Sequence, residues 1–395
     1  MILLHLLLIA YLAVVLAYWL WVLYAFLRMA RAMPVLSDLA PPEPERWPTL
    51  SVVVAACNEA DRVEAAVRTL LEEDYPDLEI ILVDDRSTDS TGEILDRLAA
   101  AADRAKVLHI THLPDGWLGK VHALRCGLEA SRGDFVLFTD ADVHFAPGAL
   151  RKAVAWCADQ GLDHLAAFPT LWRATMLVDA TISVFLRHFM LLTRPWAVGD
   201  PQSRAFVGVG AFNLVRRAAF DATDGFEWLR LEVADDAGLA YMMKRSGARC
   251  GVVAAFGDVS LCWYRSVREA ARGTEKAYAS ASACSLVRMF ITSAVMLVLE
   301  TSPLVALVPL GFPQTRAVGW AGLAPLAAFL VTVVVTTRWG GGRVMPALLT
   351  PLVVLLNLGM FLRAGVLGWW RGGVLWRGTL YRSEALRQGR RIRLM

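Results

Sequence analysis

Hydrophobic positions divide the chain into an apolar start, a mixed middle and an apolar end. Residues Ile2 to Leu27 form an almost unbroken apolar run that only His5 interrupts. About 20 such residues in a helix cross the core of a bilayer, so this run predicts a transmembrane helix, with a buried core helix as the alternative. Arg28 and Arg31 follow the run, which predicts that the middle of the chain lies in the cytoplasm. A secretory signal would carry its positive charge before a shorter apolar core.

Three further apolar runs follow residue 285: Val287 to Phe312, Val318 to Thr337 and Val344 to Trp370. Three crossings from the cytosol would leave the end of the chain outside, whereas its many arginines favour the inside, so one run is expected not to cross. The first is the candidate for a re-entrant or interfacial segment, because Glu300 lies within it and two prolines follow. The basic residues of the end are Arg371, Arg377, Arg382, Arg387, Arg390, Arg391 and Arg393.

The middle of the chain alternates between short apolar runs and segments of helical periodicity. The apolar runs predict strands buried on both faces, as in a parallel sheet. The predicted strands are Leu50 to Ala56, Glu79 to Val83, Val107 to Ile110 and Phe135 to Thr139, and the predicted helices are Ala60 to Glu73, Gly92 to Ala102 and Val121 to Ala130. This order indicates an α/β fold with a doubly wound, Rossmann-like sheet and right-handed crossovers.

These patterns predict six successive parts of the chain. A basic segment with interspersed aromatic residues before the second apolar region is expected to lie along the membrane surface, and a helix that packs between domains is the alternative reading. The parts are a transmembrane anchor (1–30), a linker (31–48) with the proline-rich stretch 41–48, an α/β domain (49–265), an interfacial amphipathic region (266–286), transmembrane or re-entrant segments (287–370) and a basic cytoplasmic tail (371–395).

Composition supports a membrane protein. Hydrophobic residues make up 56% of the 395 residues, a high share for a soluble chain. The net charge of +3 is small for this length and gives no reason to expect nucleic acid as a partner. The six cysteines have no metal-binding spacing, so they are interpreted as reduced thiols of a cytosolic domain.

Polar residues follow the first two predicted strands at their carboxyl ends, where a parallel sheet forms its binding crevice. Ala56 ends the first strand, Asn58 and Glu59 follow it, and Asp84 and Asp85 end the second. Carboxylates at this position can accept hydrogen bonds from a pyrimidine imide or from ribose hydroxyls. Capping of the next helix is the alternative, but capping does not explain two adjacent carboxylates, which repel each other.

Three more residues suggest phosphate and metal chemistry. Asp140 and Asp142 follow the strand FVLFT, and oxygen ligands of this kind suit Mg²⁺ or Mn²⁺ together with substrate phosphates. A solvated turn is the alternative, because the D-x-D pattern is common by chance. Lys120 ends the sequence GWLGK just before a predicted helix, where it can meet phosphate oxygens together with the helix dipole; an ordinary surface lysine is the alternative.

A second acidic pair, Asp235 and Asp236, opens the helix-like sequence DDAGLAYMMKRSGA. Acidic residues in a first helical turn are favoured by the helix dipole, so a structural role is one reading. The other is that Asp236 is a general base for a hydroxyl acceptor, provided that it shares a pocket with the donor and the metal. The residues expected to shape the acceptor pocket are Trp172, His188, Trp196 and the turn Gly208-Val209-Gly210, although a core role fits each of them equally well.

The motifs VVVAACNE, VDDRSTD, GWLGK, FTDAD and DDAGLAYMMKRSG, in this order, resemble the family-2 inverting glycosyltransferases. The resemblance covers Leu50 to Tyr278 and is strongest to membrane-bound, lipid-modifying members of the ceramide glucosyltransferase-like and carotenoid- or hopanoid-associated kinds. It implies a GT-A fold, a nucleoside-diphosphate sugar as donor, and Mg²⁺ or Mn²⁺.

The resemblance also implies roles for single residues. Asp85 would contact the nucleoside, Asp140 the ribose or sugar of the donor, Asp142 together with Asp140 the metal, and Asp236 would be the base. The remaining donor-binding candidates are Ala56, Asn58, Glu59, Asp84, Lys120 and Asp235.

Two departures from the family pattern bear on function. The usual Glu-Asp at the base position is Asp235-Asp236 here, and a shorter first acid could alter how the base is positioned. The Q/R-x-x-R-W signature of chain-extending synthases is absent, since the corresponding region reads WYRSVR. The expected activity is therefore inverting, metal-dependent, non-processive sugar transfer to a hydroxyl of a membrane lipid, by an integral protein of the inner membrane. A processive polysaccharide synthase, a non-catalytic membrane scaffold and a nucleotidyltransferase are the alternatives.

Overall fold

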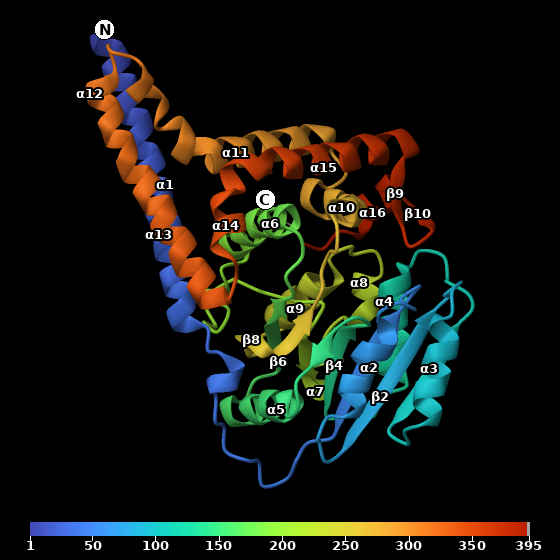
Figure 1. The fold of residues 1–395 in the computed structure, drawn as a ribbon. Helices are drawn as coiled ribbons and strands as arrows, with labels where there is room; N and C mark the ends of the chain where they lie inside the picture. The colour runs from blue at the N-terminus through green and yellow to red at the C-terminus, as the bar shows by residue number, and fades with distance from the viewer. Residues whose placement is uncertain (393–395) are drawn as a thin grey trace. The chain divides into compact units, whose positions relative to one another are not determined.

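The strands and helices predicted for the middle of the chain are present in the computed structural model, which describes residues 1–392 (Figure 1). The chain divides into two compact units. The sheet unit comprises Met33–Trp172, Pro195–Trp263 and the chain from Gly373 onward. The helical unit comprises Met1–Ala32, Arg173–Arg194 and Tyr264–Gly372.

The sheet unit is built on an eight-stranded sheet with the order β3-β2-β1-β4-β7-β6-β8-β5. Neighbouring strands are parallel except where β7 pairs with β4 and β6, and where β5 pairs with β8. The strands are β1 (Leu50–Ala56), β2 (Leu78–Asp85), β3 (Ala105–Ile110), β4 (Phe135–Asp140), β5 (His144–Phe145), β6 (His164–Leu171), β7 (Asn213–Arg216) and β8 (Cys250–Leu261).

Register brings the predicted site residues to one edge of this sheet. Ala56 of β1 lies opposite Asp84 of β2, and Ala55 lies opposite Asp140 of β4. Since β1, β2 and β4 are parallel, their carboxyl ends meet at the same edge. Every residue of β1 is buried, as the unbroken β-branched run predicted.

Helices cover both faces of the sheet. Alternate residues of β1, such as Val52 and Val54, share a core with α2, α3 and α5. On the other face α4 packs so closely that a Cβ on its Gly127 would overlap Val53. The helices of this unit are α2 (Val63–Leu71), α3 (Thr91–Ala100), α4 (Gly119–Glu129), α5 (Ala149–Gln160), α7 (Arg217–Asp221), α8 (Gly225–Leu229), α9 (Asp235–Arg245) and α16 (Ser383–Gly389), with 3-10 turns at Leu36–Asp38 and Pro195–Ala197.

The predicted α/β fold is confirmed, with differences in detail. The four predicted strands lie within β1 to β4, and the three predicted helices correspond to α2, α3 and α4. The predicted tail contains structure of its own, a hairpin of β9 (Gly373–Trp376) and β10 (Thr379–Arg382) followed by α16. Of its predicted basic residues, Arg393 lies outside the described residues.

Long apolar helices form the helical unit, with α1 beside α13 and α11 beside α15 (Figure 1). Five segments of the described chain are long and apolar enough to cross a membrane: Ile2–Ala32, Met176–Ala197, Leu286–Val305, Arg316–Gly340 and Thr350–Arg371. The helices of this unit are α1 (Ile2–Ala32), α6 (Met176–Thr193), α10 (Val267–Ser282), α11 (Leu286–Val305), α12 (Arg316–Gly319), α13 (Leu323–Gly340), α14 (Val344–Leu348) and α15 (Thr350–Arg371), with 3-10 turns at Val308–Gly311 and Trp320–Gly322.

Glu300, the charge that suggested a re-entrant segment, is buried in this unit and paired with Arg187 of α6. Arg187 also donates to the Thr350 hydroxyl of α15 at 3.1 Å and lies over the Trp19 ring of α1. A buried charge is tolerated when an opposite charge and hydrogen bonds accompany it. The charge of Glu300 is therefore no argument against α11 as a membrane helix.

Membership of the sheet unit limits the number of crossings. Trp263 and Gly373 flank the last group of apolar helices, and both belong to the sheet unit. Chain that leaves and re-enters one folded unit begins and ends on the same side of a membrane. We therefore expect the stretch Tyr264–Gly372 to make an even number of crossings, so that α11, α13 and α15 do not all cross once; the number of crossings stays a prediction. By the same reasoning we expect α6 to begin and end on one side, because β6 before it pairs with β8 after it.

The predicted interfacial region folds as α10, which packs on α15. Glu275 of α10 forms ion pairs with Arg363 and Arg371 at 3.1 and 3.0 Å, and Tyr278 is buried between the helices. Packing against a neighbouring helix, the alternative reading, accounts for these contacts. A location of α10 at a membrane surface stays a prediction.

Candidate functional site

Lys120, in the first turn of α4, gathers two predicted site residues around its ammonium group. Its Nζ lies 2.7 Å from Asp140 Oδ1 at the end of β4 and 3.1 Å from Asp235 Oδ2 at the start of α9. Burial alone would lower the pKa of Lys120, but the negative charges of Asp140, Asp235 and Asp236 outweigh it and raise this pKa above its usual range. The lysine thus stays charged and connects β4 to α9.

Asp236, the predicted base, is held by backbone groups. Its carboxylate accepts hydrogen bonds from the Gly210 N–H at 3.0 Å and from the Ala237 N–H at 2.8 Å. These two bonds fix the orientation of the carboxylate. Asn213 donates to the Asp236 carbonyl at 3.1 Å and fixes the start of α9 against β7.

The predicted turn Gly208-Val209-Gly210 lies directly against this residue. A Cβ on Gly208 would overlap the Asp236 carbonyl oxygen, and one on Gly210 would lie 2.7 Å from Asp140 Oδ2. Close backbone approach therefore requires glycine at position 208, whereas a side chain at position 210 would displace the Asp140 carboxylate. The turn positions Asp236 relative to Asp140, whatever its part in binding an acceptor.

Asp142 is paired with Arg62 Nη1 at 3.1 Å. Burial and the nearby charge of Asp140 raise the pKa of Asp142 in spite of this pair. Among residues 1–392 no three acidic, histidine or cysteine side chains form a ready-made metal cage. Mg²⁺ and Mn²⁺ do not need one, since one or two carboxylates suffice when substrate phosphates supply further ligands. Asp140 and Asp142 repel each other, and Asp142 already binds one cationic group, that of Arg62. This pair of aspartates therefore fits a divalent cation.

The nucleoside side of the predicted site lies where β1 and β2 end. Asp85 is buried and bound by Arg86 Nε at 2.7 Å, while Asp84 accepts from the Ser87 N–H at 3.2 Å and contacts His109. Asn58 accepts from the Thr88 N–H at 2.8 Å and has a left-handed backbone. These hydrogen bonds hold the loops after β1 and β2 in place. Asp84 and Asn58 therefore have a structural role in these loops, in addition to any contact with a donor.

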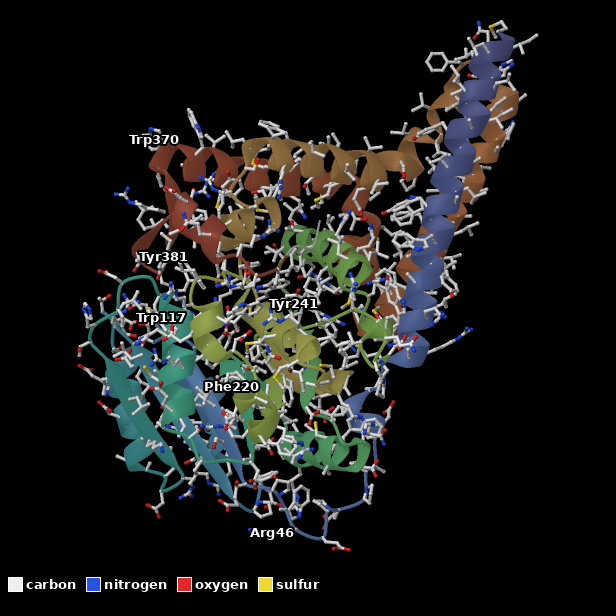
Figure 2. The ribbon with its side chains drawn as sticks, turned by 180° about the vertical axis from the view of Figure 1, so that it is seen from behind. Arg46, Trp117, Phe220, Tyr241, Trp370 and Tyr381 are labelled. Carbon is white, nitrogen blue, oxygen red and sulfur yellow. The ribbon has the colours of Figure 1, made fainter. Side chains whose placement is uncertain are left out.

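The sequence reasoning missed two residues of the β9–β10 hairpin. Arg377 Nη2 lies 3.3 Å from Glu59 Oε1, and the Tyr381 hydroxyl accepts from the Gly119 N–H at 3.1 Å. Figure 2 shows Tyr381 near Trp117, which belongs to the motif before α4. Both residues are in the segment that composition alone described as a basic tail. The available signal was Gly378 between the short runs VLW and TLY, since glycine is favoured in the second position of a two-residue hairpin turn.

The cavity among Lys120, Gly210, Asn213, Asp235 and Asp236 measures about 10 Å³, room for roughly one water molecule. The centre around Lys120 is thus closed. Of the two acids that bind Lys120, Asp140 is the more exposed, with 36% of its side chain accessible against 6% for Asp235.

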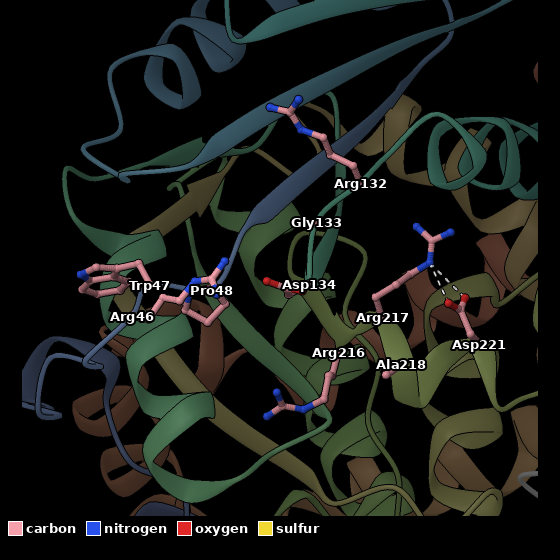
Figure 3. A pocket seen from close by; sticks show the side chains of 10 residues that line it. All are labelled: Arg46, Trp47, Pro48, Arg132, Gly133, Asp134, Arg216, Arg217, Ala218 and Asp221. Carbon is pink, nitrogen blue, oxygen red and sulfur yellow. Dashed lines mark hydrogen bonds and ion pairs between the residues drawn. The ribbon is translucent and has the colours of Figure 1, made fainter.

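A larger pocket of about 580 Å³ lies at the opposite edge of the sheet, where β1 and β4 begin (Figure 3). Two of its arginines form ion pairs within the chain. Arg217 Nε lies 3.0 Å from Asp221 Oδ1, and Arg216 Nε lies 3.2 Å from Asp163 Oδ1. None of the predicted site residues lines it. The other lining residues are Arg46, Trp47, Pro48, Arg132, Gly133, Asp134 and Ala218.

The other residues expected around an acceptor do not form one cluster within either unit. Trp172 packs on His144 at a ring distance of 4.6 Å, and Trp196 lies in a 3-10 turn, both in the sheet unit. His188 belongs to α6 of the helical unit, where its Nδ1 contacts the Val184 carbonyl at 2.9 Å. Their role in binding an acceptor stays a prediction.

Comparisons with known proteins agree on one family. Residues 51–221 match the family described as "Glycosyl transferase family 2". The chain is 33% identical over 118 residues to GalNAc(5)-diNAcBac-PP-undecaprenol beta-1,3-glucosyltransferase of Campylobacter jejuni, covering 30% of this chain and 37% of that one. It is 27% identical over 263 residues to beta-monoglucosyldiacylglycerol synthase of Synechocystis sp., covering 61% of this chain and 52% of that one. The chain thus spans about half or less of the curated relatives it matches.

Among solved structures, the mannosyltransferase PcManGT from Pyrobaculum calidifontis, in complex with GDP-Man and Mn²⁺, is similar in fold. The TM-score is 0.53 with 21% sequence identity, and the match covers 91% of this chain and 98% of that one. The likeness shows a shared fold that extends beyond the sheet to most of the chain.

Proposed function

We propose that the chain, whose residues 51–221 match glycosyl transferase family 2, transfers a sugar from a nucleoside-diphosphate sugar to a hydroxyl of a membrane lipid, with inversion at the anomeric carbon. The observation that carries the proposal is the convergence of Asp140, Asp235 and Asp236 on Lys120, from β4 and α9. Segments nearly 100 residues apart thus supply acids to one place at the carboxyl edge of a parallel sheet.

In this mechanism Asp236 accepts the proton of the acceptor hydroxyl as that oxygen attacks the anomeric carbon. The bond to the diphosphate breaks on the opposite face, which inverts the configuration. The backbone N–H groups of Gly210 and Ala237 orient the Asp236 carboxylate. A base that is held in a fixed orientation contributes a large part of the rate of a group transfer.

The proposed donor complex includes Mg²⁺ or Mn²⁺, held by Asp142 and Asp140. A divalent ion there supplies positive charge that stabilises the departing diphosphate. Lys120 fixes Asp140, and Asp84, Asp85, Asn58 and Glu59 line the nucleoside side. PcManGT, the protein of similar fold named above, was solved in complex with GDP-Man and Mn²⁺. This complex supports a nucleotide sugar as the class of donor, without naming the nucleotide that this chain uses.

The proposed acceptor is a lipid because the chain carries apolar helices long enough to enter a bilayer. Two relatives have undecaprenol and diacylglycerol in their names, which supports the same class. We place the sheet unit in the cytoplasm at the inner membrane, on the side indicated by Arg28 and Arg31. Transfer of one or a few sugars follows from the absent chain-extension signature.

The test uses the full chain in membranes, with labelled UDP-glucose and GDP-mannose as donors and a total lipid extract as acceptor. Asp236→Asn is expected to lower transfer at least about 100-fold, as loss of a general base does, while nucleotide affinity is kept. Asp159→Asn, which changes an exposed acid of α5, is the matched control and is expected to transfer normally. Full transfer by Asp236→Asn would assign the base to another residue.

A further inference from the structure

The hairpin of β9 and β10 is fastened to the donor side of the sheet unit at several points. Beyond the Tyr381 contact with Gly119, Glu232 accepts from the N–H groups of Arg391 and Ile392, at 2.6 and 3.1 Å, just after α16. Arg391 also donates to the Trp228 carbonyl at 2.8 Å. The segment after the last apolar helix therefore has a fixed place beside the predicted donor residues.

Arg377 is at the tip of this hairpin, in a backbone conformation that arginine rarely adopts. Trp376 pairs with Thr379, so Arg377 and Gly378 form a two-residue turn in which both have positive φ, 47° and 80°. Asn-Gly is favoured in such turns because a longer side chain at the first position is strained there. Non-glycine residues held in this region often mark a functional demand on the side chain.

The guanidinium of Arg377 is only partly satisfied. Its Nη2 reaches Glu59, but its Nη1 is buried without a hydrogen-bond acceptor among the described residues. An unpaired buried donor is costly and is normally satisfied by a ligand or water. Arg377 lies close enough to Glu59 and Cys57, at the carboxyl end of β1, for its charge to act on both.

The hairpin also changes which groups are available to phosphate. The sequence predicted that the N-terminus of α4 and Lys120 would meet the diphosphate. Instead the Gly119 N–H is capped by Tyr381, and Lys120 is held by Asp140 and Asp235. Besides the proposed divalent ion, a diphosphate at this edge therefore needs a cationic side chain other than Lys120, and Arg377 has an unused donor there.

We propose that Arg377 is a donor-binding residue, whose guanidinium contacts the diphosphate of the nucleotide sugar, and that the β9–β10 hairpin is the part of the chain that delivers it. The inference rests on the proposed function. A planar guanidinium with two free N–H groups suits phosphate oxygens better than a point charge does. On donor binding Glu59 exchanges its contact with Arg377 for contacts with the nucleotide.

The experiment measures nucleotide binding to the full chain in detergent, with Mn²⁺ present. The probes are UDP, GDP, ADP, CDP and dTDP, each compared with its monophosphate. Arg377→Asn is the informative variant, because asparagine suits the turn and the hairpin is expected to keep or gain thermal stability. Arg382→Ala removes an equal charge from an exposed position of the same hairpin and is the matched control.

Arg377→Asn is expected to weaken binding of the preferred diphosphate about 10- to 100-fold, the usual effect of losing a charge-assisted bond, with a change under about threefold for the monophosphate. Arg377→Lys should recover part of the loss. Equal weakening of mono- and diphosphate, or the same loss in Arg382→Ala, would overturn the inference and leave the proposed function standing. Failure of the unaltered chain to bind any of the five diphosphates would instead overturn the proposed function, and this inference with it.

Discussion

At the scale of single residues, the acids of the site are paired with cations of the chain itself. Asp140 and Asp235 share Lys120, Asp142 has Arg62, Asp85 has Arg86 and Glu59 has Arg377. The sequence indicated the acids, because acidic residues after buried strands are unusual. It did not indicate the partners, since Arg62, Arg86 and Arg377 look like ordinary surface residues until the fold brings them to the crevice.

Close backbone approach at Gly208 gives a prediction at this scale. In Gly208→Ala the new methyl group overlaps the carbonyl of Asp236, so the start of α9 must shift and the base moves with it. Transfer is expected to fall at least about 100-fold, as a displacement near 1 Å can cause, while the chain still folds. Steady-state transfer to lipid is the measurement.

Gly199→Ala is the control for this substitution, because nothing lies within 4 Å of a Cβ at Gly199. Equal activity of the two alanine variants would show that the turn 208–210 does not position the base.

At the scale of elements, β1 to β4 could be predicted because each is a short apolar run with polar flanks. The shorter strands β5, β7 and β9 could not, because two to four residues carry too little pattern. Their pairing depends on distant partners: β7 exists between β4 and β6, and it holds Asn213 against α9. This distant pairing explains why the support of Asp236 was not visible in the sequence.

Buried His164 of β6 gives a pH prediction. Burial lowers its pKa from 6.5 to about 4, against the hydrogen bond with Asn213, so the folded chain holds it neutral while the unfolded chain protonates it below about pH 6.5. Its contribution to stability is thus present above pH 6.5 and is lost as the pH falls toward 4. The melting temperature of the unaltered chain should therefore drop more between pH 7 and pH 5 than that of His164→Gln. Parallel pH profiles of the two proteins would show that His164 is not held neutral.

The Arg187–Glu300 pair gives a prediction for packing between α6 and α11. Replacing Glu300 alone by Leu leaves Arg187 buried and unpaired, which is expected to cost about 3–5 kcal/mol. Replacing both, as Arg187→Met with Glu300→Leu, removes both charges and is expected to cost much less. Thermal melting in detergent measures both effects, and a double variant no more stable than Glu300→Leu would contradict the pairing argument.

At the scale of the whole molecule, the sequence anticipated an even number of crossings in the last apolar region, from the basic end of the chain. The number of crossings stays a prediction, and the reason to test it is that the end of the chain binds Glu232 and Gly119 of the sheet unit. What the sequence could not supply is the assignment of α6 to the helical unit, since Arg187, His188 and neighbouring polar residues weaken its apolar pattern.

This topology can be tested by labelling. A single cysteine at Arg387, on exposed α16, and another at Glu93, on α3, are expected to react with a membrane-impermeant thiol reagent from the same side of sealed vesicles. A cysteine-free background is needed, since the chain has six cysteines. Reaction of the two positions from opposite sides would contradict an even number of crossings.

The central claim is that Asp236 activates a lipid hydroxyl for a single displacement at the anomeric carbon. Its most direct test is the anomeric configuration of the glycolipid formed from an α-linked nucleotide sugar, determined by proton NMR. A β-linked product, absent with Asp236→Asn, is the predicted result, and an α-linked product would contradict the account.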